Sequence, residues 1–186
     1  MSILFTSIFT GIEVIWDRQF GFLKETLVAP VPRILIMIGR TLGGATVSVL
    51  QGIVVLVICL AVGFRTPSLA LLPLALAFMI LTAILFTAVG TALASVLPDF
   101  QGFQLVMNFL VMPIFFLSGA LFPLTNVPRA MRMIAALDPL SYSVDGLRFA
   151  LIGVTHFGVT LDLAILCGVT AAALAIGGYL FSRIQV

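Results

Sequence analysis

Long runs of apolar residues constrain this chain more than any other feature. They occupy residues 34–64, 69–97, 104–122 and 161–181, and a transmembrane helix needs roughly 20 consecutive apolar residues. Apolar residues make up 62% of the chain and charged residues 9%, whereas an ordinary globular domain has about 25% charged residues. We therefore predict an all-α, multi-pass integral membrane protein.

The first of the predicted crossings is short. A helix of about 15 residues covers only about 22 Å at 1.5 Å per residue, which is less than a hydrocarbon core of about 30 Å. We expect this first span to be incomplete and the native N-terminus to be missing. The predicted spans are residues 1–16, 42–62, 69–97, 104–122 and 161–181.

Residues 17–30 have the pattern of a short helix that lies on the membrane surface. Its apolar and charged positions fall on different faces, with Phe20, Leu23 and Leu27 on one and Arg18, Lys24 and Glu25 elsewhere. Pro30 and Pro32 then end the helix, because proline cannot donate a backbone hydrogen bond.

Residues 123–158 are too apolar for an ordinary loop and too interrupted for a span. Asn126 before Pro128, and Asp138 before Pro139, are each typical of a helix start, with a capping side chain followed by proline. We therefore predict two short, half-buried helices in this segment.

The basic residues leave the orientation open. If residues 17–33 are cytoplasmic, five of the nine Lys and Arg residues lie inside and four outside, so the positive-inside rule barely favours this arrangement. A net charge of +2, with its basic residues scattered, argues against nucleic acid as a partner.

The sequence has no motif for binding ATP or a metal. It lacks a G-x-x-x-x-G-K-[ST] phosphate loop and an acidic run that could hold Mg²⁺. Cys59 and Cys167 lie in separate apolar runs, which is typical of free thiols. We therefore expect no cofactor, no metal and no catalytic residue in this chain.

Two sequence blocks and the order of the spans resemble the membrane subunit of ABC-2 type exporters, most closely the permeases of the daunorubicin and multidrug resistance type. The first block, FGFLKETLVAPVPR, covers residues 20–33. The second, LSGALFPLTNVPRAMRMIAALDPLSYSVDGLR, covers residues 117–148 and ends in a P-x-x-Y-x-V-D-x-x-R string.

The resemblance implies an ABC-2 type transmembrane helix bundle and a transport role without enzymatic activity of its own. Residues 17–30 would form the cytoplasmic coupling helix, which docks on an ATPase subunit that binds ATP and Mg²⁺. Residues 123–158 would form the external re-entrant helices. Members of the family normally have six spans, so on this resemblance the chain would lack the first span and the helix before it. It would act as a homodimer or with a paired permease.

The resemblance also implies roles for individual residues. Arg18, Lys24 and Glu25 would face the ATPase subunit, while Phe20, Leu23 and Leu27 would hold the coupling helix to the bundle. The external gate would contain Asp138, Pro139, Tyr142, Asp145 and Arg148, with Asp145 and Arg148 close enough to pair. Candidates to line the translocation path are Gln51, Phe103, Asn108, Phe115 and Phe116.

An apolar path with a few hydrogen-bonding groups suits amphipathic small molecules such as drugs or natural products. Export of lipid-linked polysaccharide or lipid by the same fold is the first alternative. An intramembrane hydrolase would need Ser118 and His156 to meet as nucleophile and base. An ion-coupled secondary transporter would need buried charges, and the nearest, Asp99 and Asp162, lie only at span ends.

Overall fold

The protein is described here by a computed structural model that covers residues 1–28, 30–66, 68–121 and 133–184. In these ranges the chain forms α1 (Ser2–Phe9), α2 (Ile12–Gln19), α3 (Phe22–Val28), α4 (Arg33–Ala61), the 3-10 helix η1 (Leu69–Leu71), α5 (Leu72–Val96), α6 (Phe100–Leu117), α8 (Pro139–Ile152) and α9 (Val159–Ser182). The prediction of an all-α membrane protein is confirmed.

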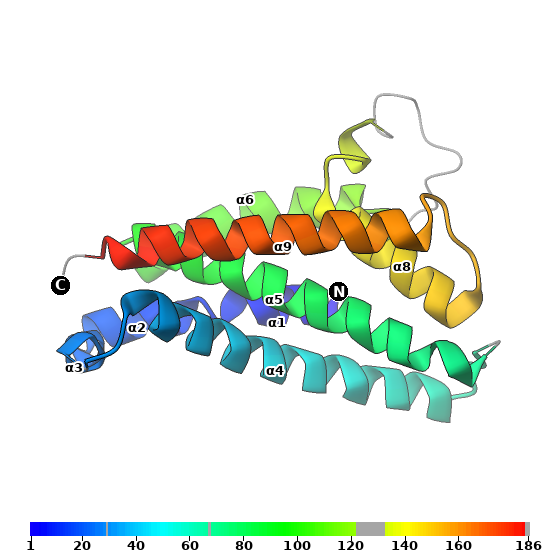
Figure 1. Cartoon of the computed structure of the whole chain (residues 1–186), viewed down its shortest axis with the longest axis horizontal. Coiled ribbons are helices and arrows are strands. Elements are labelled where there is room, and N and C mark those ends of the chain that lie inside the picture. The colour runs from blue at the N-terminus through cyan, green and yellow to red at the C-terminus, as the bar shows by residue number, and fades with distance from the viewer. Residues whose placement is uncertain (29, 67, 122–132, 185–186) are drawn as a thin grey trace.

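The long helices α4, α5, α6 and α9 extend along the long axis of a bundle (Figure 1). Among the described residues, four segments are long and apolar enough to cross a membrane, namely Arg33–Ala61, Leu69–Val96, Phe100–Leu117 and Val159–Ser182. We call the end that carries α2, α3 and the last residues of α9 the α3 end (Figure 1). The opposite end, which carries α8, is the α8 end.

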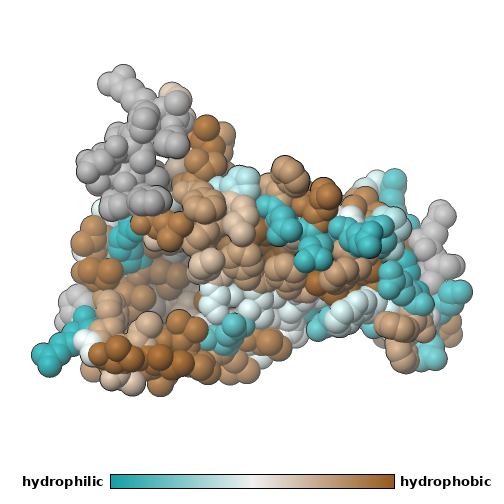
Figure 2. All heavy atoms as spheres, turned by 180° about the vertical axis from the view of Figure 1, so that it is seen from behind, coloured by the Kyte–Doolittle hydropathy of each residue, from teal (hydrophilic) through white to brown (hydrophobic). Residues whose placement is uncertain are grey.

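The outer surface of the bundle is apolar, as a lipid-facing surface should be. On α4, the exposed side chains include Val47, Leu50, Val54, Val57 and Ile58. Figure 2 shows apolar residues over much of one face, with hydrophilic residues gathered toward the α3 end. A water-soluble monomer rarely exposes an apolar patch of this extent.

Helix α5 is the centre of the bundle, because it packs against α1, α4, α8 and α9. Several of its hydroxyl groups bond to their own helix, with Thr91 donating to the Thr87 carbonyl oxygen at 2.9 Å and Ser95 to that of Thr91 at 2.7 Å. This bonding satisfies these two hydroxyl hydrogens inside an apolar core. The α5 helix is apolar on all sides, and its bonded hydroxyl groups need no contact with water, so it can lie at the centre of the bundle.

The first helical segment crosses α5 through two glycines. A Cβ on Gly90 would lie 2.4 Å from the carbonyl oxygen of Ile8, and a Cβ on Gly11 would lie 2.4 Å from that of Gly90. Both obstacles are backbone atoms, which cannot rotate away as a side chain can. Small residues at such crossings let membrane helices approach closely.

The predicted first span, residues 1–16, is divided between the two short helices α1 and α2, and α4 starts at Arg33, before the predicted residue 42.

Other boundaries also differ from the predicted ones. The predicted surface helix at residues 17–30 is divided by Gly21, whose φ of +84° ends one helix before α3 begins at Phe22. Helix α6 starts at Phe100 and not at residue 104, because Asp99 caps it by accepting a bond from the Gly102 N–H at 3.0 Å.

The predicted pair of short helices is seen in part. The second is α8, which starts at Pro139 after the cap Asp138. The first falls largely on residues 122–132, outside the described residues.

Candidate functional site

Arg18 joins α2 to the end of α5. Its Nη1 donates to the Leu97 carbonyl oxygen at 3.2 Å, and its Nη2 donates to those of Ser95 at 3.0 Å and Ala94 at 3.4 Å. Carbonyl groups in the last turn of a helix have no partner within it, and a cation there also meets the negative end of the helix dipole. Arg18 therefore points toward the end of α5, and its contact with a partner subunit stays a prediction.

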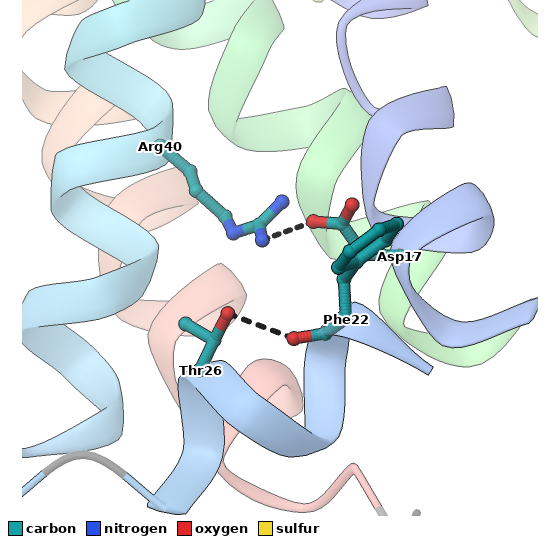
Figure 3. A network of polar contacts seen from close by, with 4 residues as sticks. All are labelled: Asp17, Phe22, Thr26 and Arg40. Atoms are coloured by element: carbon teal, nitrogen blue, oxygen red, sulfur yellow. Dashed lines mark hydrogen bonds and ion pairs between the residues drawn. The ribbon is translucent and has the colours of Figure 1, made fainter. Parts of the chain in front are cut away.

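An ion pair joins α2 to α4 nearby. Arg40 on α4 points toward Asp17 on α2, and their side chains pair above α3 (Figure 3). Arg33, at the start of α4, donates to the carbonyl oxygens of Ser182 at 2.8 Å and Ile184 at 3.2 Å. These contacts tie α2 to α4 and α4 to the end of α9.

The apolar side chain of Leu23 holds helix α3 to the bundle. Leu23 is fully buried, as expected for a residue that attaches the helix. Phe20 is 72% exposed, so the expectation that it also attaches the helix is wrong. The side chain of Leu27 lies outside the described residues. The residues left exposed, which we call the α3 surface, are Phe20, Phe22, Lys24, Glu25 and Val28.

At the α8 end, Asp138 and Pro139 start α8 as predicted. The Asp138 carboxylate accepts a bond from the Leu140 N–H at 2.9 Å, with Pro139 at the first helical position. Burial raises the pKa of Asp138 to about 6, against the opposing effect of bonds from the Leu140 N–H and the Ser141 hydroxyl. The buried Tyr142 hydroxyl donates to the Ala136 carbonyl oxygen at 2.6 Å, so Tyr142 fixes the chain just before α8.

Asp145 and Arg148 do not pair, and this prediction is wrong. The buried Asp145 carboxylate accepts bonds from the N–H groups of His156 and Phe157, each at 2.8 Å to Oδ2, and from the Thr155 hydroxyl at 3.0 Å. Arg148 instead donates to the Gly119 carbonyl oxygen at 2.9 Å, near the end of α6. The spacing permits an ion pair, but donors from the following loop surround the carboxylate. Asp145 therefore closes the loop between α8 and α9.

The residues predicted to line a path differ in their burial, and their role stays a prediction. Phe103 and Phe115 are buried in the core, whereas Phe116 is 56% exposed and Asn108 is exposed. Gln51 on α4 accepts a hydrogen bond from the Thr6 hydroxyl of α1.

The geometry offers no support for a hydrolase. The buried Ser118 hydroxyl donates to the Phe115 carbonyl oxygen at 2.8 Å, and the described residues show no hydrogen bond between Ser118 and His156. Asp162, in the first turn of α9, is fully buried, and neither carboxylate oxygen has a partner among the described residues. A buried carboxylate of this kind is what an ion-coupled transporter would need.

Sequence reasoning missed the contacts that join distant segments. Asp17 and Arg40 are 23 positions apart, and Thr6 and Gln51 are 45 apart. The only signal for the first pair is that opposite charges flank the turn at Pro30 and Pro32, where the chain reverses. The sequence holds no comparable signal for the second pair.

Comparison with known proteins gives a consistent result. The model of the family described as ABC-2 type transporter matches residues 1–152. The chain is 33% identical over 144 residues to the inner membrane transport permease YadH of Escherichia coli (strain K12), covering 74% of this chain and 55% of that protein. It is 32% identical over 132 residues to nodulation protein J of Rhizobium leguminosarum bv. viciae, covering 71% and 50%. The chain spans about half the length of these relatives.

Proposed function

The chain belongs to the ABC-2 type transporter family, and from this premise we propose that it serves as the permease subunit of an ATP-driven exporter. The proposed exporter moves amphipathic small molecules, such as drugs or natural products, out across the cytoplasmic membrane. Its relatives named as transport permeases support the transport role. The ATP and Mg²⁺ would be bound by a separate ATPase subunit.

The α3 surface is the observation that carries this proposal. Phe20, Phe22 and Val28 are 72%, 59% and 84% exposed, and Lys24 and Glu25 are exposed beside them. Aromatic and apolar side chains rimmed by charges are typical of a protein interface. The surface lies at one end of the bundle, beyond the apolar spans (Figure 1), where a water-soluble ATPase subunit could reach it.

The contacts around α3 offer a route from this surface into the bundle. Leu23 links α3 to the core, Arg18 links α2 to the end of α5, and Asp17 links α2 to α4. A displacement of α3 by the ATPase subunit would therefore move the ends of α4 and α5 with it. In a dimer of permeases, such a movement would support alternating access.

The test measures ATP hydrolysis and transport by the assembled transporter. The chain is purified together with its ATPase subunit, reconstituted in vesicles, and assayed for ATP hydrolysis and transport. We expect Glu25→Lys to reduce transport at least about fivefold, because reversing one interface charge costs on the order of 1 kcal/mol or more. Arg65→Glu is the matched control, because Arg65 is an exposed charge in the turn between α4 and η1, far from α3 in the sequence.

Two results would contradict the proposal. The first is purification of the intact complex without any ATP-binding subunit. The second is equal transport by the Glu25→Lys and Arg65→Glu proteins at equal expression, which would show that the α3 surface has no part in coupling.

A further inference from the structure

A groove of about 410 Å³ lies along the exposed side of α1 and α2, and no role has been assigned to it so far. Three aromatic residues line one side, and hydroxyl and carboxyl groups line the other. The lining residues that matter here are Phe5, Phe9 and Trp16, with Thr6, Thr10 and Glu13. The groove thus combines flat apolar surfaces with a single charged group.

The aromatic side is held in place by ring contacts. The rings of Phe5 and Phe9 stack with centroids 6.5 Å apart and an interplanar angle of 13°. Phe115 of α6 meets Phe5 edge-on, with centroids 6.4 Å apart. Trp16 is 50% exposed and continues the same side of the groove. Aromatic faces of this kind attract cations through their electron-rich faces.

The polar side has its hydroxyl hydrogens occupied. Thr6 donates to Gln51, and Thr10 donates to the Ser7 carbonyl oxygen at 2.6 Å. Glu13 is exposed, and its side chain makes no hydrogen bond or ion pair in the part of the chain that the structure describes. What the groove offers a ligand is therefore mainly hydrogen-bond acceptors and one negative charge.

The neighbouring cations are already committed to other partners. Arg18 donates to carbonyl groups at the end of α5, and Arg40 pairs with Asp17. Because these arginines are bound elsewhere, the charge of Glu13 lacks a partner from this part of α2 and α4. A ligand could supply that partner.

We propose that this groove is a binding site for an amphipathic organic cation that carries aromatic or other bulky apolar groups. Its charge pairs with Glu13 while its apolar groups lie against Phe5, Phe9 and Trp16. The Glu13 carboxylate would repel an organic anion, and the groove offers few hydrogen-bond donors to a neutral glycan. The role of the site in export rests on the proposed function, whereas the binding itself does not.

Trp16 provides a direct readout, because it is the only tryptophan in the sequence. The full chain is purified in phosphatidylglycerol nanodiscs, and its emission is followed during titration with tetraphenylphosphonium. Tetraphenylborate, which has nearly the same shape and the opposite charge, serves as the comparison. We expect a saturable change with the cation and none with the anion.

Matched variants separate the site from general attraction of cations to the membrane. We expect Glu13→Gln to weaken binding of the phosphonium about tenfold, which corresponds to about 1.4 kcal/mol, and Glu13→Asp to retain most of it. Asp99→Asn removes another exposed carboxylate, in the turn between α5 and α6, and asparagine still caps α6. The Asp99→Asn protein should bind as tightly as the wild type.

The inference is overturned if both ions change the emission equally, or if Glu13→Gln binds the phosphonium as tightly as the wild type. The comparison of the two ions uses the wild-type chain, so equal responses overturn the inference even where a variant fails to fold. A response that disappears when phosphatidylethanolamine is added would assign the groove to a lipid headgroup and also overturn the inference.

The two proposals can fail separately. Binding that depends on Glu13, in a chain that associates with no ATPase subunit, would refute the proposed function and leave the site standing. ATP-driven transport with no selective binding of the phosphonium would refute the site and leave the proposed function standing.

Discussion

Replacing Arg18 by alanine should destabilise the α3 end, because this side chain is a cap for the most central helix. The substitution removes the bonds to the carbonyl groups of Leu97, Ser95 and Ala94. A hydrogen bond to a charged group contributes about 1.5–3 kcal/mol, and a cation at a helix C-terminus about 0.3–1 kcal/mol. The bonds share one half-buried guanidinium and are not additive, so we expect a loss of about 2–3 kcal/mol in the free energy of unfolding.

The loss can be measured as a change in melting temperature. For a chain of this size, 1 kcal/mol corresponds to about 2–4 °C, so Arg18→Ala should melt about 4–12 °C below the wild type. Arg18→Lys keeps the charge but has fewer hydrogen-bond donors, so its melting temperature should lie between those of the wild type and the Arg18→Ala protein. Arg183→Ala is the matched control, because the exposed Arg183 stacks on the Tyr179 ring with Cζ 4.4 Å from its centroid, and it should shift melting by less than about 3 °C. An Arg18→Ala protein that melts like the Arg183→Ala protein would refute the role of Arg18 as a cap.

Three further outcomes test the fold. Gly90→Ala would place a Cβ 2.4 Å from the Ile8 carbonyl oxygen, so we expect a loss of about 1–3 kcal/mol, and thermal unfolding unchanged from the wild type would contradict the backbone contact. Asp145→Ala should leave the N–H groups of His156 and Phe157 without their acceptor and speed hydrogen exchange in residues 153–158. The pKa of Asp138 is raised from 3.8 to about 6, so the stability it contributes is present below about pH 4 and is lost as pH rises through 6. Asp138→Asn keeps the cap and should flatten this profile, whereas an unchanged profile would exclude Asp138 as its source.

Local signals in the sequence were sufficient for the long helices and for one cap. The apolar runs predicted the four segments that are long enough to span a membrane, because hydropathy and length are properties of a single segment. Asp138 before Pro139 predicted the start of α8 for the same reason, since a cap bonds within its own first turn.

Side-chain partners could not be predicted in the same way. Asp145 and Arg148 are at a spacing that suits an ion pair, and each found a different partner, Asp145 in the next loop and Arg148 at Gly119. Arg18 had the pattern of a surface charge, and its partners are 76 to 79 positions away. Whether a charged side chain bonds to a neighbour in the sequence or to a distant backbone group depends on how the helices pack. The spacing of residues in the sequence does not show this packing.

The charged side chains indicate which surfaces bind a ligand or a partner subunit. In a chain with 9% charged residues, a charge near the bilayer is costly unless it is paired or in contact with water. Many of the charges in the described residues have such a partner: Asp17, Arg18, Arg33, Arg40, Asp99, Asp138, Asp145 and Arg148. At the α3 end, Glu13, Lys24 and Glu25 are exposed, and their side chains have no hydrogen bond or ion pair among the described residues. These three residues are where we place the cation site and the docking surface, because a charged side chain without a bonded partner among the described residues is available to bind a ligand or a partner subunit.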